Sequence, residues 1–345
     1  MKQMLHIRCK NKKKIKDVAI GSTLSEVFDE FKLEMPFGPI CARVNNKVCG
    51  MNLCLYHNKD VEFLDMYSSS AQRNYTRTLF FILCKAVHDL YPGSEVVIDI
   101  PVSNGYYINL KIGHEVSKVD AVRIRERMQQ IIDAKIPIVR YQVPTEEAIK
   151  MFEHKGDEAK VKLLRSIGSL YTVYHQIDDY VDYYYGSLLP NTGDIYLFGL
   201  EKYYEGLLLR IPSKENPANL GELIRQDKMF EVFLEQHRRQ HILGVSTVGD
   251  FNEAVQQGHA TDMINISEAL QEKKISQIAD RIAMHPDVRM VLIAGPSSSG
   301  KTTFCKRLSI QLLANGIRPV QISLDDYFVD RHRTPLDSNG DFDYE

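Results

Sequence analysis

The sequence has no tryptophan, few cysteines and no long apolar run. Its 345 residues include six scattered cysteines, and no two of them have the C-x-x-C spacing that zinc ribbons use. This pattern is typical of small buried hydrophobic side chains in a reducing compartment. A zinc-ribbon protein is therefore excluded.

Two further absences bear on membranes and nucleic acids. The longest apolar run, Leu79–Cys84, is far too short to span a bilayer, and the N-terminal MKQMLHIRCKNKKK lacks the apolar core of a signal peptide. The formal net charge of −2 argues against a chain coated by nucleic acid, although it is compatible with a local basic patch. These features predict a cytoplasmic protein without a membrane partner.

The most informative motif lies late in the chain. Gly295–Thr302, GPSSSGKT, matches the phosphate-binding loop pattern G-x-x-x-x-G-K-[ST]. The apolar run Val288–Gly295 before it predicts a buried parallel strand. A helix is expected after it, with Gly316 at its C-cap and one apolar face formed by Phe304, Leu308, Leu312 and Leu313.

Strand, loop and helix in this order predict a nucleotide site. Loop N–H groups and the helix N-terminus would face phosphate oxygens. Lys301 would reach the β- and γ-phosphates, and the Thr302 hydroxyl would bind Mg²⁺. The predicted cofactors are ATP and Mg²⁺, and the predicted binding residues are Gly295, Pro296, Ser297, Ser298, Ser299, Gly300, Lys301, Thr302 and Thr303.

A second strand is predicted around Val320 and Ile322, and it would end at Asp325 and Asp326. A carboxylate at that edge of a parallel sheet lies on the same side as the loop. There it can accept a proton from an attacking hydroxyl or reach the Mg²⁺ shell. Asp325 and Lys301 are therefore the predicted catalytic residues.

Residues 288–345 resemble the uridine kinase and phosphoribulokinase family of P-loop kinases, through GPSSSGKTT, ISLDDYF and GDFDYE. The resemblance implies that Asp325 is the base for a nucleoside 5′-hydroxyl. It also implies an α/β sheet that continues beyond Glu345, so the chain is interpreted as a fragment of an ATP-dependent nucleoside kinase. The implied substrate contacts are Tyr327, Phe328, Asp341, Phe342 and Asp343.

Residues 1–66 are predicted to form a β-grasp domain. LHIRC, CARVN and DVEFLDMY have the patterns of strands, and NNKVCG reads as a turn. Between the first two strands, Ser22 or Thr23 with Glu26 has the spacing of a helix capping box. This segment resembles the TGS domain found at the front of threonyl-tRNA synthetases and some GTPases.

Residues 67–240 are predicted to hold a long helix, a hairpin turning at Ser103–Gly105, and further helices. They resemble the editing domain of threonyl-tRNA synthetase through AVHDLYPGSEVVIDIPVSNGYYINL, PTEEAIKMFEHKGDEAKVKLL and DDYVDYYYGSLLP. A helical arm, residues 241–286 with a helix capped by Ser267, should lead to residues 287–345. The predicted fold class is an α+β N-terminal half followed by the start of an α/β P-loop NTPase domain.

The editing resemblance fails at the residues that carry its chemistry. The family's His-x-x-x-His pair corresponds to Arg77 and Phe81, its cysteine to Tyr184 and its other histidine to Leu188. The resemblance therefore implies a retained fold without deacylase activity.

Two functions compete on these grounds. The first is an ATP-dependent kinase for a nucleoside 5′-hydroxyl. The alternative is an RNA- or metabolite-binding regulatory module on an inactive editing fold, or a P-loop kinase for another small alcohol. Lys10–Lys16, Gln236–His241 and Tyr183–Tyr185 can contact RNA or serve only as solvated and packed structure.

Overall fold

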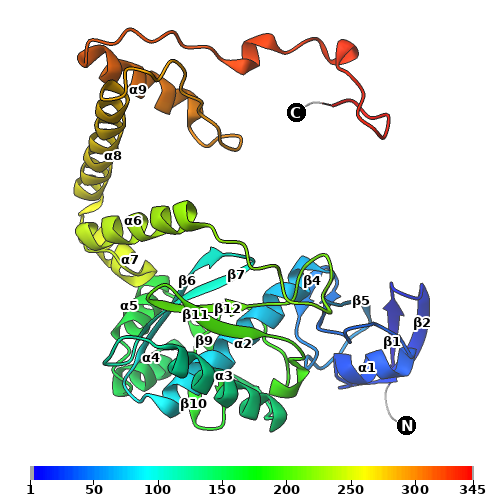
Figure 1. Cartoon of the computed structure of the whole chain (residues 1–345). Helices are drawn as coiled ribbons and strands as arrows, with labels where there is room; N and C mark the ends of the chain where they lie inside the picture. The colour runs from blue at the N-terminus through cyan, green and yellow to red at the C-terminus, as the bar shows by residue number, and fades with distance from the viewer. Residues whose placement is uncertain (1–3, 344–345) are drawn as a thin grey trace. The chain divides into compact units, whose positions relative to one another are not determined.

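The computed structural model describes residues 4–343, so residues 1–3 and 344–345, at the ends of the first and last predicted domains, lie outside it. The chain divides into two compact units (Figure 1). The first holds the residues up to 240 together with 245–253, and the second holds 241–244 and 254–345.

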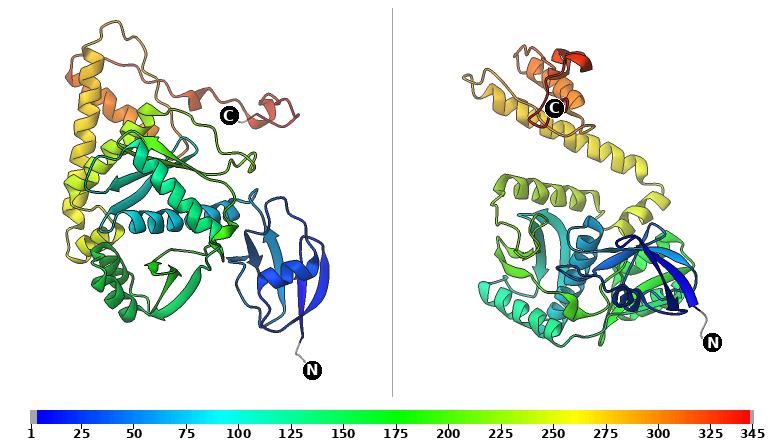
Figure 2. Two further views of the ribbon diagram at one scale, coloured as in Figure 1. Left: turned by 60° about the horizontal axis from the view of Figure 1, so that its bottom comes forward. Right: turned by 90° about the vertical axis from the view of Figure 1, so that its right-hand side faces the viewer.

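The N-terminal part is a five-stranded sheet of order β2-β1-β5-β3-β4, coloured blue in Figure 2, with helix α1 packed on it. Leu24, Val27 and Phe31 of α1 are buried. The predicted capping box forms: Thr23 Oγ1 accepts from the Glu26 N–H at 3.2 Å, and Glu26 accepts from the Thr23 N–H at 2.8 Å. The elements are β1 (Met4–Cys9), β2 (Lys14–Ala19), α1 (Leu24–Phe31), β3 (Cys41–Val44), β4 (Lys47–Cys49) and β5 (Lys59–Leu64).

The predicted β-grasp arrangement is thus present, with two strands that the sequence did not indicate. Strand β2 is mostly exposed, and β4 is three residues long within the segment predicted as a turn. Neither has an alternation strong enough to stand out. Both form because β1 and β3 offer them antiparallel hydrogen-bonding partners.

The next part is a four-stranded antiparallel sheet of order β11-β12-β7-β6, whose apolar face packs on α2 and α3. The predicted hairpin forms, with Ser103 and Asn104 both at positive φ. Phe230 of α6 packs with Tyr107 and Leu208 in a second apolar cluster. The elements are α2 (Ser69–Leu90), β6 (Glu95–Val102), β7 (Gly105–Lys111), α3 (Lys118–Asp133), β11 (Gly199–Tyr203), β12 (Gly206–Arg210) and α6 (Asp227–Leu243).

A smaller sheet of order β10-β9-β8 completes the first unit. Helices α4 and α5 pack together through a cluster that includes Ile149, Phe152 and Leu164. The elements are β8 (Val139–Pro144), α4 (Thr145–His154), α5 (Glu158–Ile167), β9 (Tyr171–Ile177), β10 (Tyr180–Asp182) and the 3₁₀ helix η1 (Thr192–Asp194).

In the second unit, α8 packs on α9 through Ile275, Ala279, Leu308 and Leu312. Gly316 ends α9 with φ +77°, as predicted, whereas Leu313 is 54% exposed and does not share the buried face. The elements are α7 (Val248–Gln256), which crosses the boundary between the units, α8 (Ala260–Ala283), α9 (Lys301–Ala314), η2 (Leu324–Tyr327) and η3 (Arg331–Arg333).

The predicted cap at Ser267 is wrong. Helix α8 begins at Ala260, so Ser267 lies within it, and its hydroxyl donates to the Met263 carbonyl at 2.7 Å. The residues before Ser267 contain no proline or glycine after Gly258. With no helix-breaking residue between them, the helix extends through the serine.

The predicted parallel strands around the phosphate loop are not formed. Residues 288–295 and 320–322 have no strand assignment, and Leu292 and Val320 are 85% and 86% exposed. A strand needs neighbouring strands for its N–H and C=O groups and its two apolar faces. Within residues 4–343 no neighbour is available to these segments, so the α/β part of the predicted fold is not present.

The apolar run Leu79–Cys84 lies in α2, where Leu79, Ile82 and Leu83 are fully buried in the protein core. Within the described part of the chain, no helix combines the length and the apolar character that crossing a bilayer requires.

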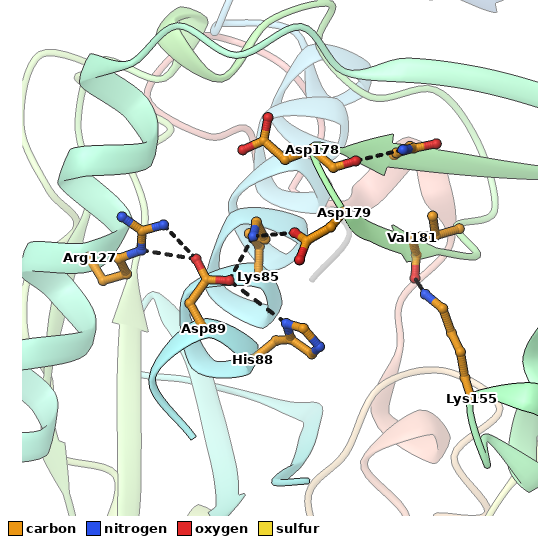
Figure 3. A network of polar contacts seen from close by, with 9 residues as sticks. Lys85, His88, Asp89, Arg127, Lys155, Asp178, Asp179 and Val181 are labelled. Atoms are coloured by element: carbon orange, nitrogen blue, oxygen red, sulfur yellow. Dashed lines mark hydrogen bonds and ion pairs between the residues drawn. The ribbon is translucent and has the colours of Figure 1, made fainter. Parts of the chain in front are cut away.

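A partly buried ion network joins α2 to α3 and to the β9–β10 turn (Figure 3). The Lys85 side chain is only 5% exposed, and its ammonium contacts Asp89 at 2.6 Å and Asp179 at 2.7 Å. Arg127 of α3 donates two hydrogen bonds to Asp89, at 2.7 and 2.9 Å. Burial acts to lower the pKa of Lys85, but the hydrogen bonds to Asp179 and Asp89 outweigh it and raise that pKa.

Replacing Lys85 should be costly. Lys85→Met leaves a half-buried Asp89 without one of its cations, so the free energy of unfolding should fall by about 3 kcal/mol. Urea unfolding followed by tyrosine fluorescence measures it. The control is Lys111→Met, which removes an exposed pair with Glu95 at 2.7 Å and should cost less than about 1 kcal/mol. Equal losses in the two variants would contradict the role given to Lys85.

Candidate functional site

The first unit contains a cleft of about 970 Å³. Three stretches of the chain line it: residues 47–56 of the β-grasp part, residues 138–140 with 164–175 around β8 and β9, and residues 183–190 after β10. Because β9 and β10 form one hairpin, the second and third stretches are held together by the β-ladder. The cleft is therefore built from segments that are distant in the sequence.

The cleft is cationic and rich in tyrosine. Its lining includes Lys47 and Arg140 and contains no aspartate or glutamate. Both cations are exposed, and neither forms an ion pair within residues 4–343. Three lining tyrosines, Tyr56, Tyr171 and Tyr185, are 60%, 61% and 86% exposed. Such a surface suits an anionic ligand with flat rings that stack on exposed aromatic side chains.

A histidine in the cleft wall has no hydrogen-bonding partner. His175 is 3% exposed, and its Nδ1 is buried and unpaired. Burial first, and then the charge of Arg140, lower the pKa of His175 to about 4. The imidazole is therefore neutral at neutral pH. His175, Lys47 and Arg140 were not identified from the sequence. The only signal at these positions is a polar residue within a partly apolar strand.

The four positions equated with the editing residues lie together, as the resemblance implied. The rings of Phe81 and Tyr184 are 5.3 Å apart in an edge-on arrangement. Arg77 donates from Nη1 to the Ser187 carbonyl at 3.3 Å, and Leu188 beside it is 4% exposed. Gly186 has φ +104°, a conformation that residues with a side chain rarely adopt, and a Cβ there would lie 2.6 Å from the same Nη1 and displace the end of the arginine.

This cluster is unsuited to hydrolysis. Burial raises the pKa of Tyr184 well above its usual value, and burial raises the pKa of the neighbouring Cys84 thiol to about 12. Neither group ionises at neutral pH to act as base or nucleophile. No group of His, Cys, Asp and Glu side chains able to hold a metal occurs among the residues that the structure describes. The Tyr184 hydroxyl and the Cys84 thiol therefore do not activate a water molecule.

The basic run Lys10–Lys16 has a structural role in part. Lys12 donates to the carbonyls of Phe31 and Lys32 at 2.9 and 2.6 Å, and Lys16 donates to that of Glu30. These carbonyls are at the C-terminus of α1, where cations stabilise the helix.

The other two segments considered for RNA contact, Gln236–His241 and Tyr183–Tyr185, are partly engaged in ion pairs and packing. In Gln236–His241, Arg239 pairs with Glu235 at 2.9 Å. Of the tyrosine run, Tyr184 packs against the main core. Tyr183 packs partly against the α4–α5 cluster and also lines the cleft, and Tyr185 is the most exposed of the three.

In the second unit the phosphate loop leads directly into α9. Ser298 and Gly300 have φ of +60° and +85°, and the Lys301 ammonium donates to the carbonyls of Gly295 and Pro296 at 2.7 and 3.0 Å. Lys301 is the first residue of α9, so Thr302 and Thr303 lie in its first turn.

The predicted catalytic and substrate residues are not gathered around this loop. Asp325 and Tyr327 lie in η2, and Tyr327 and Phe328 are 72% and 69% exposed. Asp341, Phe342 and Asp343 belong to a separate turn in which the Asp343 N–H donates to the Pro335 carbonyl at 2.9 Å. Within residues 4–343 the Asp325 carboxylate makes no hydrogen bond.

The expected absence of editing chemistry is testable directly. The full chain, incubated with an aminoacylated tRNA, should leave the rate of ester hydrolysis equal to that in buffer. The hydroxyl of Tyr184 and the thiol of Cys84 stay protonated, and the nearby Asp182 carboxylate is held by Lys160 at 2.5 Å. Release of the radiolabelled amino acid measures this rate. A matched threonine–tRNA ligase is the positive control, and acceleration by this chain would contradict the assignment.

Comparison with known proteins finds no matching family model. It does find threonine–tRNA ligases. That of Syntrophomonas wolfei is 27% identical over 55% of this chain and 30% of its own length. That of Symbiobacterium thermophilum is 24% identical over 66% of this chain and 36% of its own length. That of Natranaerobius thermophilus is 30% identical over 52% of this chain and 29% of its own length. This chain thus spans about a third of the length of these relatives.

These relatives correct the leading prediction. An ATP-dependent kinase for a nucleoside is wrong, because the relatives are aminoacyl-tRNA ligases. Within residues 4–343, the sheet that a P-loop kinase needs is also not formed. The resemblance of the front part is confirmed. Over about half of its length, this chain is similar to threonine–tRNA ligases.

Proposed function

We propose that the first unit binds RNA, taking a single-stranded segment into the cleft without hydrolysing it. The observation that carries this proposal is the lining itself, which offers Lys47 and Arg140, exposed tyrosines and no carboxylate. The similarity to ligases that act on tRNA supports RNA as the anion. The binding alternative of the sequence analysis thus replaces the kinase.

The chemistry of the lining suits a nucleotide chain better than a small metabolite. Two unpaired cations on different walls suit two phosphates, and tyrosine faces stack on any base. A single small anion would be expected to meet a converging set of donors, whereas Lys47 lies on β4 and Arg140 on β8. Binding should therefore depend on salt and tolerate changes of base sequence.

The test is a titration of the full chain with a short fluorescent single-stranded RNA over a series of salt concentrations. With two phosphate contacts, the logarithm of the association constant should fall against the logarithm of salt with a slope of about −1.4. Lys47→Ala should weaken binding and make the slope shallower by about 0.7. Lys14→Ala, an exposed lysine outside the cleft lining, is the control. Absent or salt-independent binding would refute RNA recognition.

We propose, as a second activity, that residues 295–303 bind the phosphates of a nucleoside triphosphate with Mg²⁺. The support is the path of the loop: positive φ at Ser298 and Gly300, and a Lys301 ammonium folded over the loop carbonyls. These carbonyls can release the ammonium to a more strongly charged partner. The hydroxyl oxygen of Thr302 is a ligand type that Mg²⁺ accepts, and bound Mg²⁺ would neutralise phosphate charge there.

Equilibrium dialysis of the full chain with ATP tests this second site. Lys301→Ala should reduce ATP binding at least about tenfold, since a charge-assisted contact is lost. Thr302→Val should remove the Mg²⁺ dependence with little effect on metal-free binding. Arg318→Ala, at an exposed residue outside the loop, is the control. ATP binding that survives Lys301→Ala unchanged would contradict the site.

A further inference from the structure

Resting on the proposed RNA binding, we propose that His175 is the specificity residue of the cleft, whose imidazole hydrogen-bonds an uncharged group of the bound nucleotide. That group is a base edge or a ribose hydroxyl. His175 is a residue of the cleft wall, on β9, and belongs to neither the editing-equivalent cluster nor the phosphate loop.

The first reason is that the imidazole is unsatisfied. His175 is 97% buried, and its side chain makes no hydrogen bond within residues 4–343, with Nδ1 orphaned. Buried polar atoms in native proteins nearly always have a partner, and leaving one unpaired costs free energy. A histidine retained at such a cost in the wall of a cleft of about 970 Å³ is placed for a partner that arrives with the ligand.

The second reason is that no neighbouring charged group forms a hydrogen bond or an ion pair with the imidazole. Asp182, directly opposite on β10, is held by Lys160 at 2.5 Å and by the Tyr183 N–H at 2.6 Å. Arg140, directly opposite on β8, lies on the same face as His175 and lowers its pKa. No carboxylate therefore pairs with the imidazole, and a cation lies beside it.

The third reason is that the cations of the cleft and the imidazole would recognise different parts of the nucleotide. Lys47 and Arg140 can neutralise phosphates, which carry no sequence information. A neutral imidazole has one N–H donor and one acceptor nitrogen. It can therefore pair with a hydroxyl or with a base edge, both of which combine donors and acceptors. Its burial makes the loss of that pairing more costly than at an exposed position.

The experiment compares the chain of residues 1–345 and two variants of it on one short RNA and its DNA counterpart. His175→Phe keeps the ring size but removes both nitrogens, and His175→Asn places an amide near the position of Nδ1. His175→Phe should weaken RNA binding by about 5- to 20-fold. The salt slope should not change, because no phosphate contact is lost. His175→Asn should recover part of the affinity.

The DNA arm separates the two partners. If the partner is the ribose hydroxyl, wild-type protein binds DNA more weakly than RNA, and His175→Phe has no further effect on DNA. If it is a base edge, His175→Phe costs the same on RNA and DNA, and the cost varies with the base. RNA binding by His175→Phe equal to wild type in affinity would overturn the assignment of His175 while leaving the proposed function intact.

A measurement on the wild-type chain tests the same assignment without depending on whether the variants fold. A long-range ¹H–¹⁵N spectrum reports the ring nitrogens, and RNA should shift the nitrogen signal of His175 as a hydrogen bond forms. An unshifted signal at saturating RNA would also overturn the assignment. If neither the wild-type chain nor the Lys47→Ala variant bound RNA, the proposed function and this inference would both be refuted.

Discussion

The ion network centred on Lys85 is the constraint on which the first unit depends. Its ammonium lies in the core side of α2 and is neutralised by Asp89 of the same helix and Asp179 of the β9–β10 turn, while Arg127 of α3 completes the charge balance. A buried lysine demands such partners because desolvation of an unpaired charge is prohibitive. Satisfying it anchors the hairpin, and the hairpin carries both the cleft wall and the strand that leads into Tyr184.

The similarity to threonine–tRNA ligases and the altered editing cluster fit one physical account. The fold is maintained by apolar packing, such as the edge-on contact between Phe81 and Tyr184, which tolerates new side chains of suitable shape. Hydrolysis needs ionisable groups at defined places, and the groups here are buried and neutral or occupied, as with Arg77 against Ser187. The fold can therefore persist where the side chains that carry catalysis have changed.

The correction of the kinase prediction shows that a short motif can predict a local loop but not the reaction of a whole domain. GPSSSGKT has the composition of a phosphate loop, and its positive φ angles and helix start agree with that reading. The reaction, however, requires a sheet that holds loop, Asp325 and substrate residues together. In the described residues Leu292 and Val320 face solvent, so the loop supports at most a binding proposal.

The sequence by itself determined the local features: the capping box at Thr23 and Glu26, the hairpin at Ser103–Asn104 and the end of α9 at Gly316. Each depends on residues a few positions apart, whose spacing is written in the chain. The cleft could not be predicted in this way, because Lys47 and His175 meet there only after β9 pairs with its neighbours and the β-grasp part packs beside them. Tertiary structure alone also decided that residues 288–295 form no strand, since strand formation needs hydrogen-bonding neighbours that no local pattern supplies.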